Sequence, residues 1–121
     1  MKSALIDSNS IVQNLISGDL TFVKAKAEYD RLVLPMVILL EITFVLEKVY
    51  RLPRIEIVEK LRKIIVDPKI DAERSMYFYI SEIYRTQTPL SIVDCYLLIQ
   101  AKELGIDLIS LDKKLKRKIK I

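Results

Sequence analysis

Four acidic residues, Asp7, Glu41, Asp94 and Asp112, interrupt or end otherwise apolar stretches of the sequence. Charged side chains are almost never fully buried without a partner, so acids in these places need a reason. If distant segments bring the four carboxylates together, they repel one another unless a cation lies between them. A cluster of oxygen ligands selects hard divalent ions, so Mg²⁺ or Mn²⁺ is the expected cofactor. Such ions activate a water for displacement at phosphorus, and the expected chemistry is phosphodiester hydrolysis.

Each acid also has a purely structural interpretation. Asp7 and Asp112 follow expected strands, where aspartate is common in turns and helix caps. Asp94 can cap the helix that it opens. Glu41 can pair with Lys48, which lies seven residues later on the same face of an expected helix. These interpretations are stronger for each residue alone than for the four together.

Short apolar runs alternate with helical patterns along the chain. The expected strands are residues 3–6, 32–34, 69–71 and 106–111, and the expected helices are residues 10–16, 20–31, 36–50, 54–66, 72–85 and 93–104. This alternation predicts an α/β protein with a three-layer α/β/α fold and a small central parallel sheet, and the excess of helix predicts an additional helical hairpin. The first strand should be buried on both faces, and the helix 36–50, apolar nearly all round, should be mostly buried. Parallel strands end at a shared crevice, which Asp7 and Asp112 should both face.

Composition limits the classes of protein and of site. The chain has 121 residues, of which 51% are hydrophobic and 30% charged, which suits a single domain over residues 1–121. The longest apolar run, residues 32–40, is too short to cross a bilayer, so no membrane partner is expected. The lone Cys95 has no internal disulfide partner, which favours a cytoplasmic location. The sequence has no histidine, which excludes Ser-His-Asp and Cys-His catalysis and histidine-ligated zinc.

The C-terminal end of the sequence is strongly basic. The net charge is +4, and six of the basic residues lie between Lys113 and Lys120. This concentration of positive charge favours a polyanionic partner. The residues expected to contact the substrate are Lys113, Lys114, Lys116 and Arg117. A solvated terminal helix is the structural alternative.

Three segments of the sequence carry a resemblance to a known family. They are IDSN near the N-terminus, VILLEITFVLEKVYRLPRIEI in the middle, and VDCYLLIQAKELGIDLISLDKKL near the C-terminus. In order and spacing they resemble a PIN domain, in particular the VapC-like ribonuclease toxins of prokaryotic toxin–antitoxin pairs, over essentially the whole chain. The resemblance implies four catalytic, metal-binding acids, which are Asp7, Glu41, Asp94 and Asp112. It also implies two polar residues that orient the carboxylates or the attacking water, Asn9 and Ser110.

The resemblance implies partners as well. The substrate is expected to be a structured RNA, often tRNA, cut in a single-stranded loop where the bases are accessible. The protein is expected to form a homodimer and to be neutralised by a small antitoxin whose C-terminal segment can reach the acidic site. The first and fourth strands are expected to be neighbours. One departure is Ser91, where many members carry a further acid, so we expect no more than one tightly bound ion.

Three other functions fit the sequence less well. A haloacid-dehalogenase-like phosphatase needs a second Asp two residues after Asp7, and that position is Asn9. A response regulator needs a phosphorylatable Asp after a middle strand, and the acids here are placed elsewhere. The remaining alternative is a non-catalytic PIN-like module that binds RNA or acts as a scaffold. The presence of all four acids argues against this non-catalytic alternative.

Overall fold

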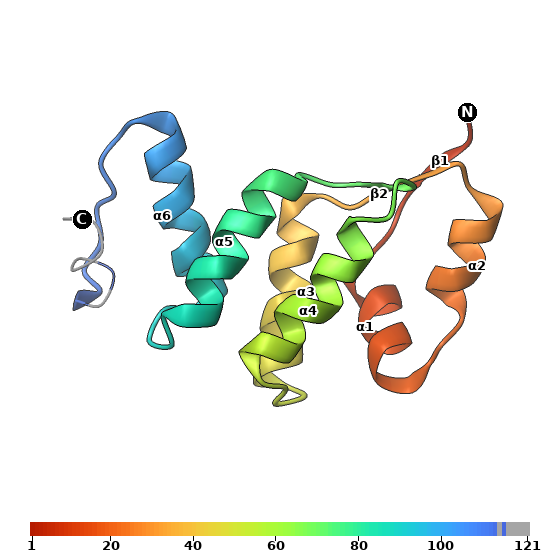
Figure 1. Cartoon of the computed structure of the whole chain (residues 1–121), viewed down its shortest axis with the longest axis horizontal. Coiled ribbons are helices and arrows are strands. Elements are labelled where there is room, and N and C mark those ends of the chain that lie inside the picture. Colours follow the sequence, from red (N-terminus) through yellow and green to blue (C-terminus); the bar gives the residue numbers. More distant parts are fainter. Residues whose placement is uncertain (114, 116–121) are drawn as a thin grey trace. The chain divides into compact units, whose positions relative to one another are not determined.

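The computed structural model describes residues 1–113 and 115. Within them the chain runs through β1 (Ser3–Leu5), α1 (Ser8–Ser17), α2 (Thr21–Glu28), β2 (Arg31–Val33), α3 (Met36–Lys48), α4 (Arg54–Ile65), β3 (Ile70–Asp71), α5 (Arg74–Thr86) and α6 (Ile92–Leu104) (Figure 1). This helix-rich α/β arrangement with a small parallel sheet confirms the predicted fold class. The chain divides into two compact units, residues 1–74 and 75–121. No helix in the described part has both the length and the apolar character that crossing a membrane requires.

The first unit contains a three-stranded parallel sheet in the order β1-β2-β3. Ser3 pairs with Arg31 and Leu32 pairs with Ile70, so β2 lies in the centre. Leu32 on this central strand is 1% exposed, whereas Leu5 on the edge strand β1 is 68% exposed. An edge strand has a neighbour on one side only. The expectation that the first strand is buried on both faces is therefore wrong.

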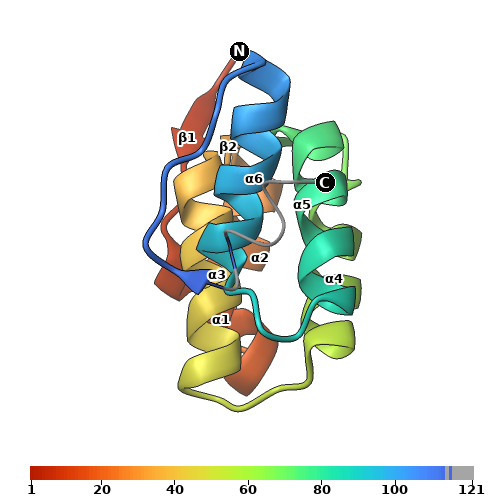
Figure 2. The ribbon, with the colours of Figure 1, turned by 90° about the vertical axis from the view of Figure 1, so that its left-hand side faces the viewer.

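The helices of the first unit pack through apolar stripes. α1 packs against both α2 and α3, and α3 packs against α4. α3 and α4 form a hairpin closed by residues 49–53, in agreement with the predicted helical hairpin (Figures 1 and 2). α4 begins directly after Pro53, because proline has no backbone N–H and fits the start of a helix. Its inward face is a fully buried stripe at helical spacing: Ile57, Val58, Leu61 and Ile65.

α3 is less buried than its composition predicts. One side of the helix is inaccessible to solvent and carries Leu39, Ile42 and Leu46. The opposite side carries four exposed residues at helical spacing, which are Val37, Glu41, Phe44 and Lys48. An apolar composition therefore does not mean that the whole helix surface is covered, and the expectation that Glu41 lies in a mostly buried helix is wrong.

The end of α4 is tied to β3 by one side chain. The Arg74 guanidinium donates hydrogen bonds to the backbone carbonyls of Ile65, Asp67 and Ile70. Carbonyls in the last turn of a helix have no donor within the helix, so an outside donor is needed when they are shielded from water. Arg74 supplies that donor and fixes the path of the chain from α4 into β3.

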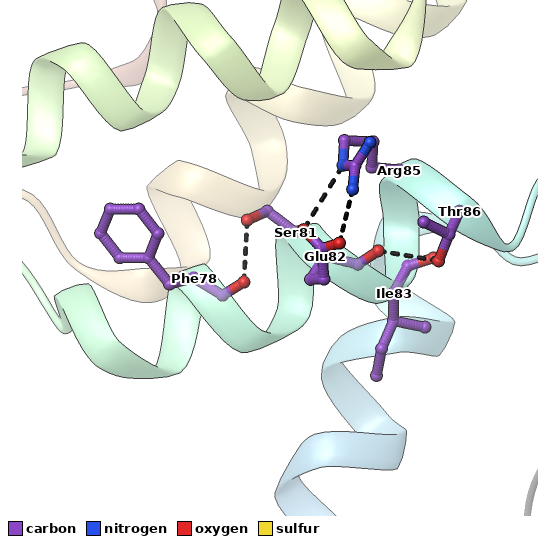
Figure 3. Close-up of polar contacts among 6 residues, drawn as sticks. All are labelled: Phe78, Ser81, Glu82, Ile83, Arg85 and Thr86. Atoms are coloured by element: carbon purple, nitrogen blue, oxygen red, sulfur yellow. Dashed lines mark hydrogen bonds and ion pairs between the residues drawn. The ribbon is translucent and has the colours of Figure 1, made fainter.

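The second unit contains α5 and α6. In the last turns of α5, Glu82 accepts from Arg85 at 2.5 Å through its carboxylate and from the Thr86 hydroxyl at 2.9 Å through its carbonyl (Figure 3). The Ser81 hydroxyl donates to the Phe78 carbonyl one turn earlier (Figure 3). These contacts stabilise the C-terminal end of α5, before the loop that leads to α6.

Residues 106–111, predicted as the fourth strand, form no strand in the described part of the chain. Ile106 is 61% exposed, and Ile109 and Leu111 are each 94% exposed. An apolar run becomes a strand only when a neighbouring strand takes up its backbone N–H and C=O groups. The described residues provide no such neighbour for this segment. The expectation that Asp112 stands at the exit of a fourth strand is therefore wrong.

Candidate active site

Asp7 lies two residues after the end of β1 and is the N-cap of α1. Its Oδ1 accepts a hydrogen bond from the backbone N–H of Ser10 at 2.9 Å. Hydrogen bonding by Ser10 lowers the pKa of the Asp7 carboxyl, so this group is charged at neutral pH. Asp7 thus follows the first strand as predicted, and it also fulfils the capping interpretation.

Glu41 is exposed on α3 and is held by a residue from α1. The Ser8 hydroxyl donates a hydrogen bond to Glu41 Oε1. The described residues contain no ion pair between Glu41 and Lys48, so the suggested pairing along the helix is wrong. An exposed carboxylate is hydrated and needs no such ion pair.

Ser8 links the segments that carry the two acids of the first unit. It directly follows Asp7, and its side chain is buried with 8% exposure. Asn9, which was expected to support the carboxylates, is exposed and contacts neither of them in the described part of the chain. Sequence reasoning missed Ser8, because nothing local shows a contact between residues 33 positions apart. Its place next to Asp7 was the one available signal.

Asp94 lies at the third position of α6 and forms a capping box with Ser91. Ser91 Oγ accepts from the Asp94 backbone N–H, and Asp94 Oδ2 accepts from the Ser91 backbone N–H, each at 3.1 Å. The amino end of a helix favours negative charge. Asp94 Oδ1 has no hydrogen-bond partner among the residues that the structure describes. Ser91, the departure from the family pattern, is therefore the N-cap of the helix that carries Asp94.

Asp112 and Ser110 form a local turn contact in the second unit. Ser110 Oγ accepts a hydrogen bond from the Asp112 backbone N–H at 3.0 Å. This contact goes to the backbone of Asp112, whereas the expected role of Ser110 concerned the carboxylate. Asp112 and the neighbouring Lys113 are exposed. The other expected RNA contacts lie outside the described residues: Lys114, Lys116 and Arg117.

The donor chemistry fits a hard divalent ion, although the described residues contain no group of three or more metal-binding side chains close enough to hold one. Asp7 and Glu41 belong to the first unit, and Asp94 and Asp112 belong to the second. Asp7, Glu41 and Asp94 each have one carboxylate oxygen fixed by a hydrogen bond. Glu41 and Asp94 each retain a second oxygen with no hydrogen-bond partner among the described residues, and carboxylate oxygens are what Mg²⁺ and Mn²⁺ prefer.

The sequence matches the PIN domain family over residues 4–120, so the chain belongs to this family and the predicted resemblance to it is confirmed. PIN domains are generally nucleases, that is, hydrolases, and generally use divalent metals. No curated protein matches the chain in a sequence comparison.

Proposed function

We propose that this PIN domain is an Mg²⁺- or Mn²⁺-dependent endoribonuclease in which Asp7, Glu41, Asp94 and Asp112 hold the ion. The observation that supports the proposal most strongly lies in the first unit. Asp7 carries its charge directly after β1, and its neighbour Ser8 binds the carboxylate of Glu41. Two acids from separate segments are thereby held within one unit, and Glu41 keeps an oxygen that has no hydrogen-bond partner among the described residues. Such oxygens are the ligands that metal-dependent phosphodiester hydrolysis requires.

The ion, when bound, supplies Lewis acidity and lowers the pKa of a bound water. The residues of the chain would bind the ion and hold the substrate. Asp7 offers a carboxylate that is charged at neutral pH, and hydrogen bonding by Ser10 lowers its pKa further. Asp94 is oriented by Ser91 at the amino end of α6, where negative charge is favoured. The exposed Lys113 follows Asp112 directly and can hold a substrate phosphate.

We propose further that the substrate is a structured RNA, such as tRNA, and that the protein is the toxin of a VapC-like toxin–antitoxin pair. The net charge of +4 and the cluster of basic residues after Asp112 support a polyanionic substrate. The sequence resemblance supports a homodimer, a small antitoxin as inhibitor and a cytoplasmic location. Lys113, Lys114, Lys116 and Arg117 are the proposed contacts with the RNA backbone.

The test of the proposed reaction is cleavage of total tRNA by the purified protein with Mg²⁺ or Mn²⁺, with and without EDTA. The matched variant is Asp94→Asn, because the Asn side-chain oxygen can still accept from the Ser91 N–H and keep the start of α6 intact. We expect cleavage by the wild type that EDTA abolishes, and no cleavage by Asp94→Asn with an unchanged circular dichroism spectrum. Cleavage that resists EDTA, or that Asp94→Asn retains, contradicts the proposal. RNA binding without cleavage indicates the non-catalytic alternative.

A further inference from the structure

Three serine and threonine residues are buried in the described part of the chain: Ser8, Thr43 and Ser81. Thr43 donates to the Leu39 carbonyl at 2.8 Å, and Ser81 donates to the Phe78 carbonyl at 3.1 Å. Both bonds stay within the helix that carries the residue, which is the usual way for a helix to satisfy a hydroxyl. Ser8 instead bonds across the unit to Glu41, 33 positions along the chain.

The position of Ser8 explains this difference. Ser8 is the first residue of α1, so no carbonyl of an earlier turn of this helix is available to accept from its hydroxyl. A buried hydroxyl without an acceptor costs free energy. Because α1 packs against α3, the acceptor within reach is the carboxylate of Glu41.

The bond also has a consequence for Glu41. A glutamate on an exposed helix surface has several rotatable bonds and samples many rotamers in water, and fixing it costs conformational entropy. The hydroxyl of Ser8 engages Oε1 and thereby restricts the carboxylate, while Oε2 has no hydrogen-bond partner in the described part of the chain. Partners of this kind commonly orient metal-ligating carboxylates.

We propose that Ser8 is a positioning residue that pre-orients Glu41 for the metal ion, a role that the sequence had suggested for Asn9. The inference rests on the proposed metal-dependent function. Ser8 acts through Glu41 and does not itself bind the ion. Ser17 is an exposed serine on the same helix, and its hydroxyl donates to the Gln13 carbonyl at 2.8 Å, so it provides a matched control.

The experiment is a calorimetric titration of the metal-free protein with Mn²⁺, which needs no substrate. We expect Ser8→Ala to weaken Mn²⁺ binding by about 10- to 100-fold, the usual cost of removing a residue that orients a ligand. Ser8→Thr retains the hydroxyl and should restore most of the affinity, and Ser17→Ala should bind as the wild type does. Circular dichroism identifies any variant that fails to fold. If Ser8→Thr fails because of its extra methyl group, Ser8→Ala in the Glu41→Ala background decides the question.

In that background Glu41 is absent, so removing Ser8 should change the remaining Mn²⁺ affinity by no more than about 2-fold. An equal loss with and without Glu41 shows that Ser8 acts by another route and overturns the inference. Wild-type affinity in Ser8→Ala, or an equal loss of affinity in Ser17→Ala, also overturns it and leaves the proposed function standing. A wild-type protein that binds no Mn²⁺ contradicts the proposed function itself, and the role of Ser8 is then overturned with it.

Discussion

Ser91 and Asp94 cap the start of α6 reciprocally, each backbone N–H donating to the other's side chain at 3.1 Å. A proposed metal ligand is therefore also part of the local structure of a helix. Asp7 has the same double role at the start of α1. A cap contributes about 1 kcal/mol to stability. Substitutions at these positions report on catalysis only if the replacement keeps the cap.

Asp7→Asn and Asp7→Ala separate capping from metal binding. Asn and Asp are equally good N-caps, so Asp7→Asn should leave the free energy of unfolding of the metal-free protein unchanged or slightly raised. Asp7→Ala should lower that free energy by about 1 kcal/mol, because the Ser10 N–H loses its acceptor. Both variants should lose cleavage. Urea unfolding in EDTA measures the difference, and a loss of stability in Asp7→Asn as large as that in Asp7→Ala contradicts the capping account.

The charge of Asp7 makes a contribution to stability that depends on pH. Hydrogen bonding by Ser10 lowers the pKa of Asp7 in the folded state below its unfolded value of about 3.9. The stabilisation is therefore present above about pH 4 and is lost as the pH falls through the folded pKa. Asp7→Asn cannot titrate, so the wild type should lose stability relative to this variant as the pH falls from about 5 to about 2. A difference between the two that stays constant in urea unfolding over this range contradicts the assignment.

The substitution Ser91→Asp tests whether Ser91 limits the protein to one tightly bound ion. Aspartate is a good N-cap, so α6 should keep its start, and the new carboxylate stands near Asp94 where many family members carry an acid. We expect the number of bound Mn²⁺ ions to rise above one. Ser91→Asn keeps the cap without charge and is the control. An unchanged stoichiometry in Ser91→Asp shows that Ser91 does not limit metal binding.

Arg74→Met should destabilise the fold without affecting metal binding directly. The substitution removes the donor for the carbonyls of Ile65, Asp67 and Ile70 and leaves them partly shielded from water. Hydrogen bonds from charged groups contribute about 1.5–3 kcal/mol each and are not additive, so we expect a loss of at least about 3 kcal/mol for the three together. Arg74→Lys keeps the charge but not the planar fork and should fall between the wild type and Arg74→Met. Chemical denaturation measures all three, and a loss below about 1 kcal/mol contradicts the role given to Arg74.

Features with local causes could be predicted from the sequence. Gly18 and Gly105 end α1 and α6 with φ of 74° and 65°, backbone conformations that glycine adopts without strain. Pro53 precedes α4, and Asp7 follows the first strand, as expected. In each case the residue type sets the backbone locally, so no distant partner is needed.

Features that depend on distant partners could not be predicted in this way. Residues 106–111 are apolar enough for a strand, but pairing depends on a neighbour that the segment does not specify. The exposure of Glu41 depends on which side of α3 its neighbours cover, and its bond with Ser8 joins two helices. The family resemblance supplied the set of acids, while the contacts that orient them required coordinates.

The most direct measurement of the central claim is a Mn²⁺ titration of the wild type and four single variants: Asp7→Asn, Glu41→Gln, Asp94→Asn and Asp112→Asn. If the four carboxylates share one ion, the wild type should show one tight site. Each variant should weaken that same site by at least about 100-fold, the upper end of the effect typical of residues that only orient ligands. The absence of a tight Mn²⁺ site in the wild type would contradict the account. It would also be contradicted if the variants of one unit abolished the site while the variants of the other unit left it intact.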